Sequence, residues 1–103
     1  MNKRLEMLEK LTSSGKADAF AYYALALEYR KEGRVDDALN AFVTLKGNDA
    51  NYLPMYLMAG QMLVEAERTA EARGWLEEGI SLARARGDGK TLGELESELS
   101  NAR

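Results

Sequence analysis

Acidic side chains are the most plentiful groups in this chain that could carry out chemistry. They form two closely spaced sets on segments of helical pattern: Glu65, Glu67 and Glu71, and Glu94, Glu96 and Glu98. General acid–base catalysis by carboxyl groups needs burial or a neighbouring charge that raises the pKa of one of them. Both sets instead have the spacing of a solvated helix face. We therefore expect no catalytic residue and no enzymatic activity.

The composition excludes most other site chemistry. The chain has no cysteine and no histidine, which removes thiol nucleophiles, Ser-His couples, disulfides and nearly every zinc or iron site. The glycines of the segment 87–89 follow a predicted helix and lack the Lys-Ser ending of a phosphate-binding loop. We therefore expect no metal site and no cofactor.

Charge and hydropathy narrow the class of partner. The chain has 103 residues, of which 46% are hydrophobic, enough for one domain with a thin core. A net charge of -3 gives no general attraction for phosphate backbones, so nucleic acid is not an expected partner.

No apolar run approaches the roughly 18 residues of a membrane span, and the chain begins with mixed charges. We expect a cytoplasmic protein without membrane insertion.

The elements that position these side chains are helices. Apolar residues follow the helical period almost everywhere, and no stretch alternates as a half-buried strand does. The fold class predicted is all-α with six helices, at residues 2–13, 18–32, 35–45, 54–66, 70–86 and 90–101.

Capping and breaking residues set these limits. Asp18 is a suitable N-cap for the second helix, and Gly33 suits the tight turn after that helix. Pro54 fits the first turn of the fourth helix, where its missing N–H costs nothing. The segments 47–49 and 87–89 are expected to end the third and fifth helices.

One pattern of large and small side chains occurs twice in the chain. The residues Tyr22, Leu25, Ala26, Tyr29, Ala38 and Phe42 have counterparts thirty-four positions later at Tyr56, Ala59, Gly60, Leu63, Ala72 and Leu76. Two crossing helices need a small residue opposite a large one. A simple helical hairpin would not need them in the same order at the same offset, so the pattern predicts a repeat protein.

The period and the residue types resemble the tetratricopeptide repeat, whose units have the pattern W-x2-L-G-x2-Y and then A-x3-F. The first unit matches almost completely. The second is looser, because Glu67 stands where the first has Gly33. Neither unit has the closing proline, since Ala50 and Arg84 occupy those places. The resemblance implies antiparallel helix-turn-helix units that form a short right-handed α-α superhelix.

The resemblance also implies an organisation of one domain over residues 1–103. Its parts are an N-terminal helix at 1–15, repeats at 19–52 and 53–86, and a C-terminal capping helix at 88–103. Leu8 and Leu11 align with Phe42 and Leu45, so the first helix looks like the second half of a degenerate repeat. In the last helix Leu92, Leu95 and Leu99 are expected to face inward, and Trp75 is expected beneath or beside it.

In the resembled family, the first helix of each unit lines a concave groove that holds extended peptides or partner helices. By alignment this peptide-binding groove would be lined by Phe20, Tyr23, Ala24, Leu27, Arg30, Lys31, Leu57, Met58, Gln61, Val64 and Glu65. Family members that clamp a C-terminal carboxylate use lysines, asparagines and an arginine along this surface. Here Tyr23, Leu27, Leu57 and Met58 occupy those places, which disfavours a carboxylate clamp.

The function implied is that of an adaptor or scaffold for protein–protein interaction, which binds a hydrophobic peptide or an amphipathic helix. Phe20 and Tyr23 would anchor the ligand, while Arg30 and Lys31 would select an acidic flank. The alternative is a structural homo-oligomer in which another copy fills the groove or the open end. The chain's own terminal helix is a third possible cover for the groove. The sequence does not identify the partner.

Overall fold

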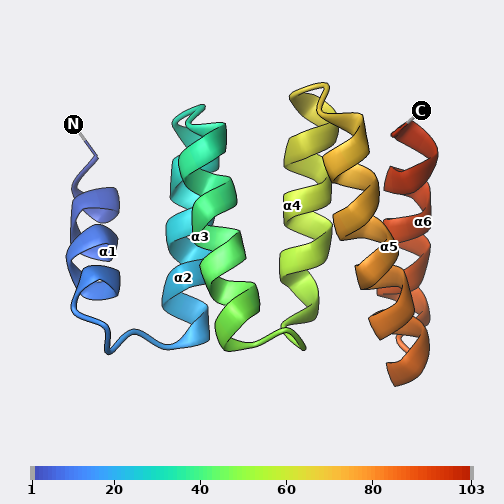
Figure 1. Cartoon of the computed structure of the whole chain (residues 1–103), viewed down its shortest axis with the longest axis horizontal. Coiled ribbons are helices and arrows are strands. Elements are labelled where there is room, and N and C mark those ends of the chain that lie inside the picture. Colours follow the sequence, from blue (N-terminus) through green and yellow to red (C-terminus); the bar gives the residue numbers. More distant parts are fainter. Residues whose placement is uncertain (1, 103) are drawn as a thin grey trace. The chain divides into compact units, whose positions relative to one another are not determined.

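The computed structural model describes residues 2–102, which form six α-helices and no strand (Figure 1). The helices are α1 (Lys3–Ser13), α2 (Ala19–Lys31), α3 (Val35–Asn48), α4 (Leu53–Glu65), α5 (Thr69–Arg86) and α6 (Gly89–Asn101). This confirms the all-α prediction and the number of helices. The chain divides into two compact units, Met1–Tyr52 and Leu53–Arg103, which we describe separately.

Side-chain caps fix the starts of three helices. The carboxylate of Asp18 accepts a hydrogen bond from the amide of Ala21 at 2.9 Å, as its position predicted. Asn2 caps α1 in the same way, and Asp88 caps α6 through the amide of Thr91 at 3.1 Å. Each cap pairs an amide that the first helical turn leaves without a backbone partner.

The third helix ends within the predicted segment 47–49, but it extends three residues beyond its predicted end at residue 45. Helix α3 continues through Gly47 to Asn48, and the amide of the C-cap residue Asp49 donates to the carbonyl of Leu45 at 2.7 Å. A glycine ends a helix where the backbone turns left-handed, as at Gly33 and Gly87. Gly47 has no positive φ, so the helix passes through it.

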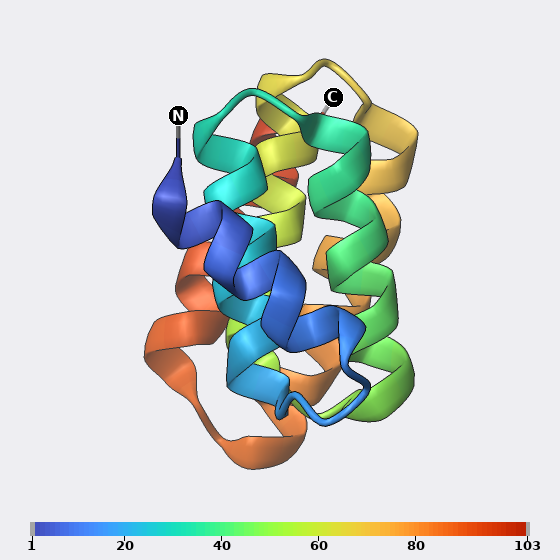
Figure 2. The ribbon, with the colours of Figure 1, turned by 90° about the vertical axis from the view of Figure 1, so that its left-hand side faces the viewer.

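In the first unit, α2 packs against both α1 and α3 (Figure 2). The small residues Ala26 and Ala38 are fully buried together with Phe42, as the repeat pattern requires. Leu8 of α1 is buried, but Leu11 is 47% exposed although it aligns with the fully buried Leu45. The correspondence between α1 and the second helix of a repeat therefore fails at Leu11.

In the second unit, α4, α5 and α6 all pack against one another. A Cβ atom on Gly60 of α4 would lie 2.6 Å from Cγ of Leu76 on α5. A Cβ atom on Gly79 would lie 2.6 Å from Cβ of Tyr56 and 2.9 Å from Cδ2 of Leu95. These two glycines therefore allow the three helices to approach closely.

The capping helix buries its apolar side as predicted, although unequally. Leu95 is fully buried, whereas Leu92 and Leu99 are partly exposed. Trp75 packs against Tyr56 of α4, with ring centroids 5.9 Å apart. Its predicted position beneath or beside the last helix stays a prediction.

The turns inside the two helical hairpins have the same backbone geometry. In the first, Gly33 has a φ of 76° and the amide of Arg34 donates to the carbonyl of Tyr29 at 2.9 Å. In the second turn, Glu67 has a φ of 60° and the amide of Arg68 donates to the carbonyl of Leu63 at 2.8 Å. Glu67 thus adopts the left-handed conformation of the glycine that it replaces.

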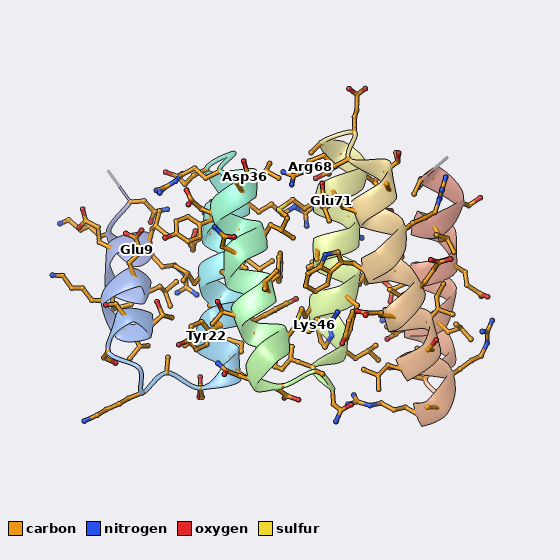
Figure 3. All side chains as sticks on the ribbon, viewed as in Figure 1. Glu9, Tyr22, Asp36, Lys46, Arg68 and Glu71 are labelled. Carbon is orange, nitrogen blue, oxygen red and sulfur yellow. The ribbon has the colours of Figure 1, made fainter. Side chains whose placement is uncertain are left out.

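The residue after each of these turns also repeats its ion pair. Arg34 Nε lies 2.9 Å from Asp37 Oδ2. Arg68 Nε lies 2.8 Å from Glu71 Oε1, and Figure 3 labels these two residues. Both pairs join residues three apart in the first turn of a helix. Both pairs lie at the surface, where solvent screens the charges, so they add little stability. They are a second sign of the repeat.

Replacing the two turn residues should have opposite effects on stability. Glu67→Gly should raise the free energy of unfolding by about 0.5 to 1 kcal/mol, because it removes a left-handed non-glycine residue. Gly33→Ala should lower the free energy of unfolding by about 1 kcal/mol, because it places a non-glycine residue in the left-handed conformation. Urea unfolding measures both changes. A Glu67→Gly variant that is less stable than the parent would contradict this account of the turn.

Two glycines of α5 offer a matched test of helix packing. Gly79→Ala should destabilise the fold by about 1 to 3 kcal/mol, because Tyr56 and Leu95 leave no room for a methyl group. Gly74 lies in the same helix with open space around its Cβ position, so Gly74→Ala should stabilise by about 0.5 to 1 kcal/mol. Thermal unfolding compares the two; equal effects would show that helix propensity alone decides them.

Candidate functional site

One face of α2 lines an apolar hollow in the first unit. Five residues of α2 have the spacing i, i+3, i+4, i+7 and i+11, which places them on one side of the helix: Phe20, Tyr23, Ala24, Leu27 and Lys31. These five residues line a hollow of about 250 Å³ together with Glu28 of α2 and Arg4 of α1. We call this site the α2 hollow; its lining residues are Arg4, Phe20, Tyr23, Ala24, Leu27, Glu28 and Lys31.

The apolar wall of the α2 hollow is unusually accessible. The Phe20 side chain is 63% exposed, while Tyr23 and Leu27 are half-buried and Ala24 is buried. The ring of Tyr23 lies 5.2 Å from that of Tyr52, centroid to centroid. Burial and the proximity of Tyr52 raise the pKa of Tyr23 despite the charge of Arg30. Tyr23 is therefore an uncharged aromatic group near neutral pH.

The rim of the hollow carries charge. Arg4 Nε pairs with Glu28 Oε1 at 3.0 Å, and the Arg4 side chain remains 59% exposed while that of Glu28 is only 10% exposed. The second carboxylate oxygen of Glu28 is buried without a hydrogen-bond donor. Lys31 is exposed one helical turn beyond Leu27. Two cations thus border the apolar wall, and the one lining carboxylate is largely buried against Arg4.

Five of the six groove residues predicted in the first unit line this hollow. Arg30, the sixth, does not line the hollow, but it lies close enough to Tyr23 for its charge to oppose the rise in the pKa of that tyrosine. In the second unit the predicted residues lie along α4: Leu57 is buried, Met58, Gln61 and Val64 are partly exposed, and Glu65 is exposed. Met55 and Met62 of the same helix are buried, so they fill space in the core.

Sequence reasoning missed Arg4 and Glu28. The alignment assigned the groove to the first helix of each unit, whereas Arg4 lies on α1. Glu28 is an acidic residue within the apolar segment of α2, and a carboxylate at such a position must be paired to be buried. That unusual position was the signal that Glu28 needs a cation as partner, and the basic residues of the first helix were candidates for it.

A larger hollow of about 790 Å³ lies between α5 and α6 in the second unit. Three of its four charged lining residues have partners within the unit. Arg84 lies 3.5 Å from Glu96, and Arg73 Nε donates to the carbonyl of Ala102 at 3.2 Å. Its apolar lining residues Ile80, Leu99 and Ala102 are buried or partly buried, whereas Phe20 is 63% exposed, so we take the α2 hollow as the candidate site. Across residues 2–102, no three acidic, histidine or cysteine side chains are grouped to hold a metal ion.

Solved structures identify the family. A tetratricopeptide repeat domain protein from Salinibacter ruber is 34% identical; its crystal structure matches with a TM-score of 0.74 over 84% of this chain and 96% of that chain. Its solution structure gives the same identity and TM-score over 82% and 86%. The chain belongs to the tetratricopeptide repeat family. A protein from Bordetella parapertussis is 25% identical, with a TM-score of 0.83 over 99% of this chain and 89% of that one.

No protein-family model matches the sequence, and no curated protein matches it. Membership of the tetratricopeptide repeat family suggests a protein-interaction module in general terms. Within residues 2–102, none of the helices combines the length and the apolar character that crossing a bilayer would require.

Helix α1 contributes Arg4 to the site and makes two hydrogen bonds with α2. The Tyr29 hydroxyl donates to Glu9 Oε2 at 2.6 Å, and the Tyr22 hydroxyl donates to the carbonyl of Thr12 at 3.3 Å. Figure 3 labels Glu9 and Tyr22 on the two helices. Burial, together with the hydrogen bond to Glu9 as the next largest cause, raises the pKa of Tyr29 to about 12.

The Tyr29 contact makes the stability of the first unit depend on pH above about 10. Because the pKa of Tyr29 is higher in the folded state than its ordinary value, its stabilising effect is complete below about pH 10 and is lost as the pH approaches 12. Tyr29→Phe should cost about 1 kcal/mol at neutral pH and should make the loss of stability at high pH shallower. Chemical unfolding at several pH values measures this.

Glu9→Gln is the control for that experiment. It keeps an acceptor for the Tyr29 hydroxyl and removes the charge that raises the tyrosine's pKa, so its high-pH profile should fall between those of the parent and Tyr29→Phe. Identical profiles for all three proteins would show that the Tyr29–Glu9 contact does not hold α1.

Proposed function

We propose that this protein is a non-enzymatic adaptor or scaffold that binds a peptide or a partner helix on the exposed face of α2. The observation that supports this most strongly is the α2 hollow, in which the aromatic wall of Phe20 and Tyr23 stands beside exposed cations. Covering a largely exposed phenylalanine contributes roughly 1 to 2 kcal/mol. Aromatic anchors of this kind contribute most of the energy of many interfaces.

The occupant favoured is a protein segment and not a small molecule. Sites for drug-sized ligands have volumes of roughly 300 to 1,000 Å³, whereas the α2 hollow has about 250 Å³. A hollow of this size suits one bulky apolar side chain, with the rest of the ligand lying along the helix. For the second unit, the groove residues Leu57, Met58, Gln61, Val64 and Glu65 of α4 stay a prediction from the alignment.

A second candidate is a structural homo-oligomer, and an observation on α1 favours it. Met7 and Leu11, one helical turn apart, are both largely exposed, and two such side chains on an end helix suit contact with another copy. Sedimentation velocity over a concentration series distinguishes the candidates, because a protein that stays monomeric at high concentration is not an oligomer.

Tyr23→Ala tests the adaptor proposal. Peptides selected from a displayed random library on the parent protein should bind the variant roughly tenfold to hundredfold more weakly, because an aromatic anchor is lost. Fluorescence polarisation measures the affinities, and far-UV circular dichroism should show an unchanged helical signal.

Val43→Ala is the matched control for Tyr23→Ala. Val43 is an exposed apolar residue of the same unit, at 54%, and it does not line the α2 hollow. Its loss should leave peptide affinity unchanged. If no selected peptide depends on Tyr23, or if Val43→Ala weakens binding as much, the site proposed is wrong.

A further inference from the structure

The charges around the α2 hollow are unequal, and the inequality points to the chemistry of the ligand. Arg4 and Lys31 are both exposed at the rim, whereas Glu28 is buried and already engaged with Arg4. With two cations and one carboxylate, the lining of the hollow has a net charge of +1, although the whole chain has a net charge of -3. An acidic ligand gains nothing from the overall charge, so any preference for acid must come from this rim.

Glu28 forms an ion pair with Arg4. Arg4 Nε lies 3.0 Å from Glu28 Oε1, and a guanidinium has five N–H donors in one plane. An ion pair at Nε leaves the donors of the terminal nitrogens for a second acceptor. A carboxylate is the acceptor whose two oxygens match this geometry best.

We propose that α1 contributes the specificity residue of this site, and that the occupant is a peptide segment with a bulky apolar side chain close to an Asp or Glu. The apolar side chain enters the hollow against Phe20, Tyr23 and Leu27, and the carboxylate pairs with Arg4. Glu28 acts as the positioning residue for Arg4. This inference rests on the function proposed above and adds to it the chemical class of the partner.

Synthetic peptides that differ in one charge test the inference. A fluorescent peptide selected on the parent protein is compared with versions in which each Asp or Glu near its apolar anchor is changed to Asn or Gln. The parent protein should bind the acidic peptide more tightly than one of its amide versions by on the order of tenfold. The Arg4→Gln variant should bind both equally, with the affinity that the parent has for the amide version.

Arg34→Gln is the matched control. Arg34 also pairs through Nε with a carboxylate, that of Asp37 at 2.9 Å, but it does not line the α2 hollow. This variant should keep the full preference for the acidic peptide. Because Arg4→Gln alone leaves the buried carboxylate of Glu28 without its cation, the double variant Arg4→Gln with Glu28→Gln is measured as well. It should lose the preference while its unfolding midpoint stays close to that of the parent.

The outcomes separate this inference from the function on which it rests. Peptides that need Tyr23 but show no preference for acid, or a preference that survives in both Arg4 variants, would overturn the role of Arg4 and leave the adaptor function standing. Peptides whose binding is independent of Tyr23 would overturn both. A protein that is dimeric without peptide and becomes monomeric on Phe20→Ala would show that a second copy occupies the hollow, which also overturns the inference.

Discussion

The close approach of paired helices at small side chains is the constraint on which the rest of this structure depends. Ala26 and Ala38 are fully buried in the first unit, and Gly60 lies against Leu76 in the second with no space for a methyl group. Once these positions are fixed as small, the large residues beside them must fill the remaining volume at native packing density. The same order of large and small residues then recurs in both units.

This constraint also decides which side of α2 is left for function. Ala26 follows Tyr22 by four residues and precedes Tyr29 by three, so the three share one side of α2, where Ala26 is fully buried and the two tyrosines donate hydrogen bonds to α1. Another side carries Phe20, which is 63% exposed, and Tyr23, which is half-buried against Tyr52. One face of the helix therefore serves the core and α1, and another forms the candidate site.

The sequence allowed the repeat, the six helices and the Asp18 cap to be predicted, because each depends on local spacing and on short-range hydrogen bonding. It did not reveal that Gly47 stays helical, since a glycine's conformation depends on the path that the next residues of the chain take in space. Nor did it show that Glu67 takes the left-handed conformation: the geometry of the turn prevailed over the residue's preference. Five groove residues came from alignment, but Arg4 required knowing how α1 lies on α2.

Glu28 is the residue whose presence packing alone does not explain. A carboxylate that is largely buried, with one oxygen lacking a donor, costs stability, and an apolar residue of similar volume in such a place is often neutral or stabilising. The ion pair with Arg4 at the rim of the hollow explains why a glutamate is present at this position. Helix α1 is then both a cap and a part of the site, because Leu5 and Leu8 bury its apolar side while Arg4 faces the hollow. Deleting α1 would remove stability and recognition together, so only point substitutions that keep Leu5 and Leu8 can separate the two.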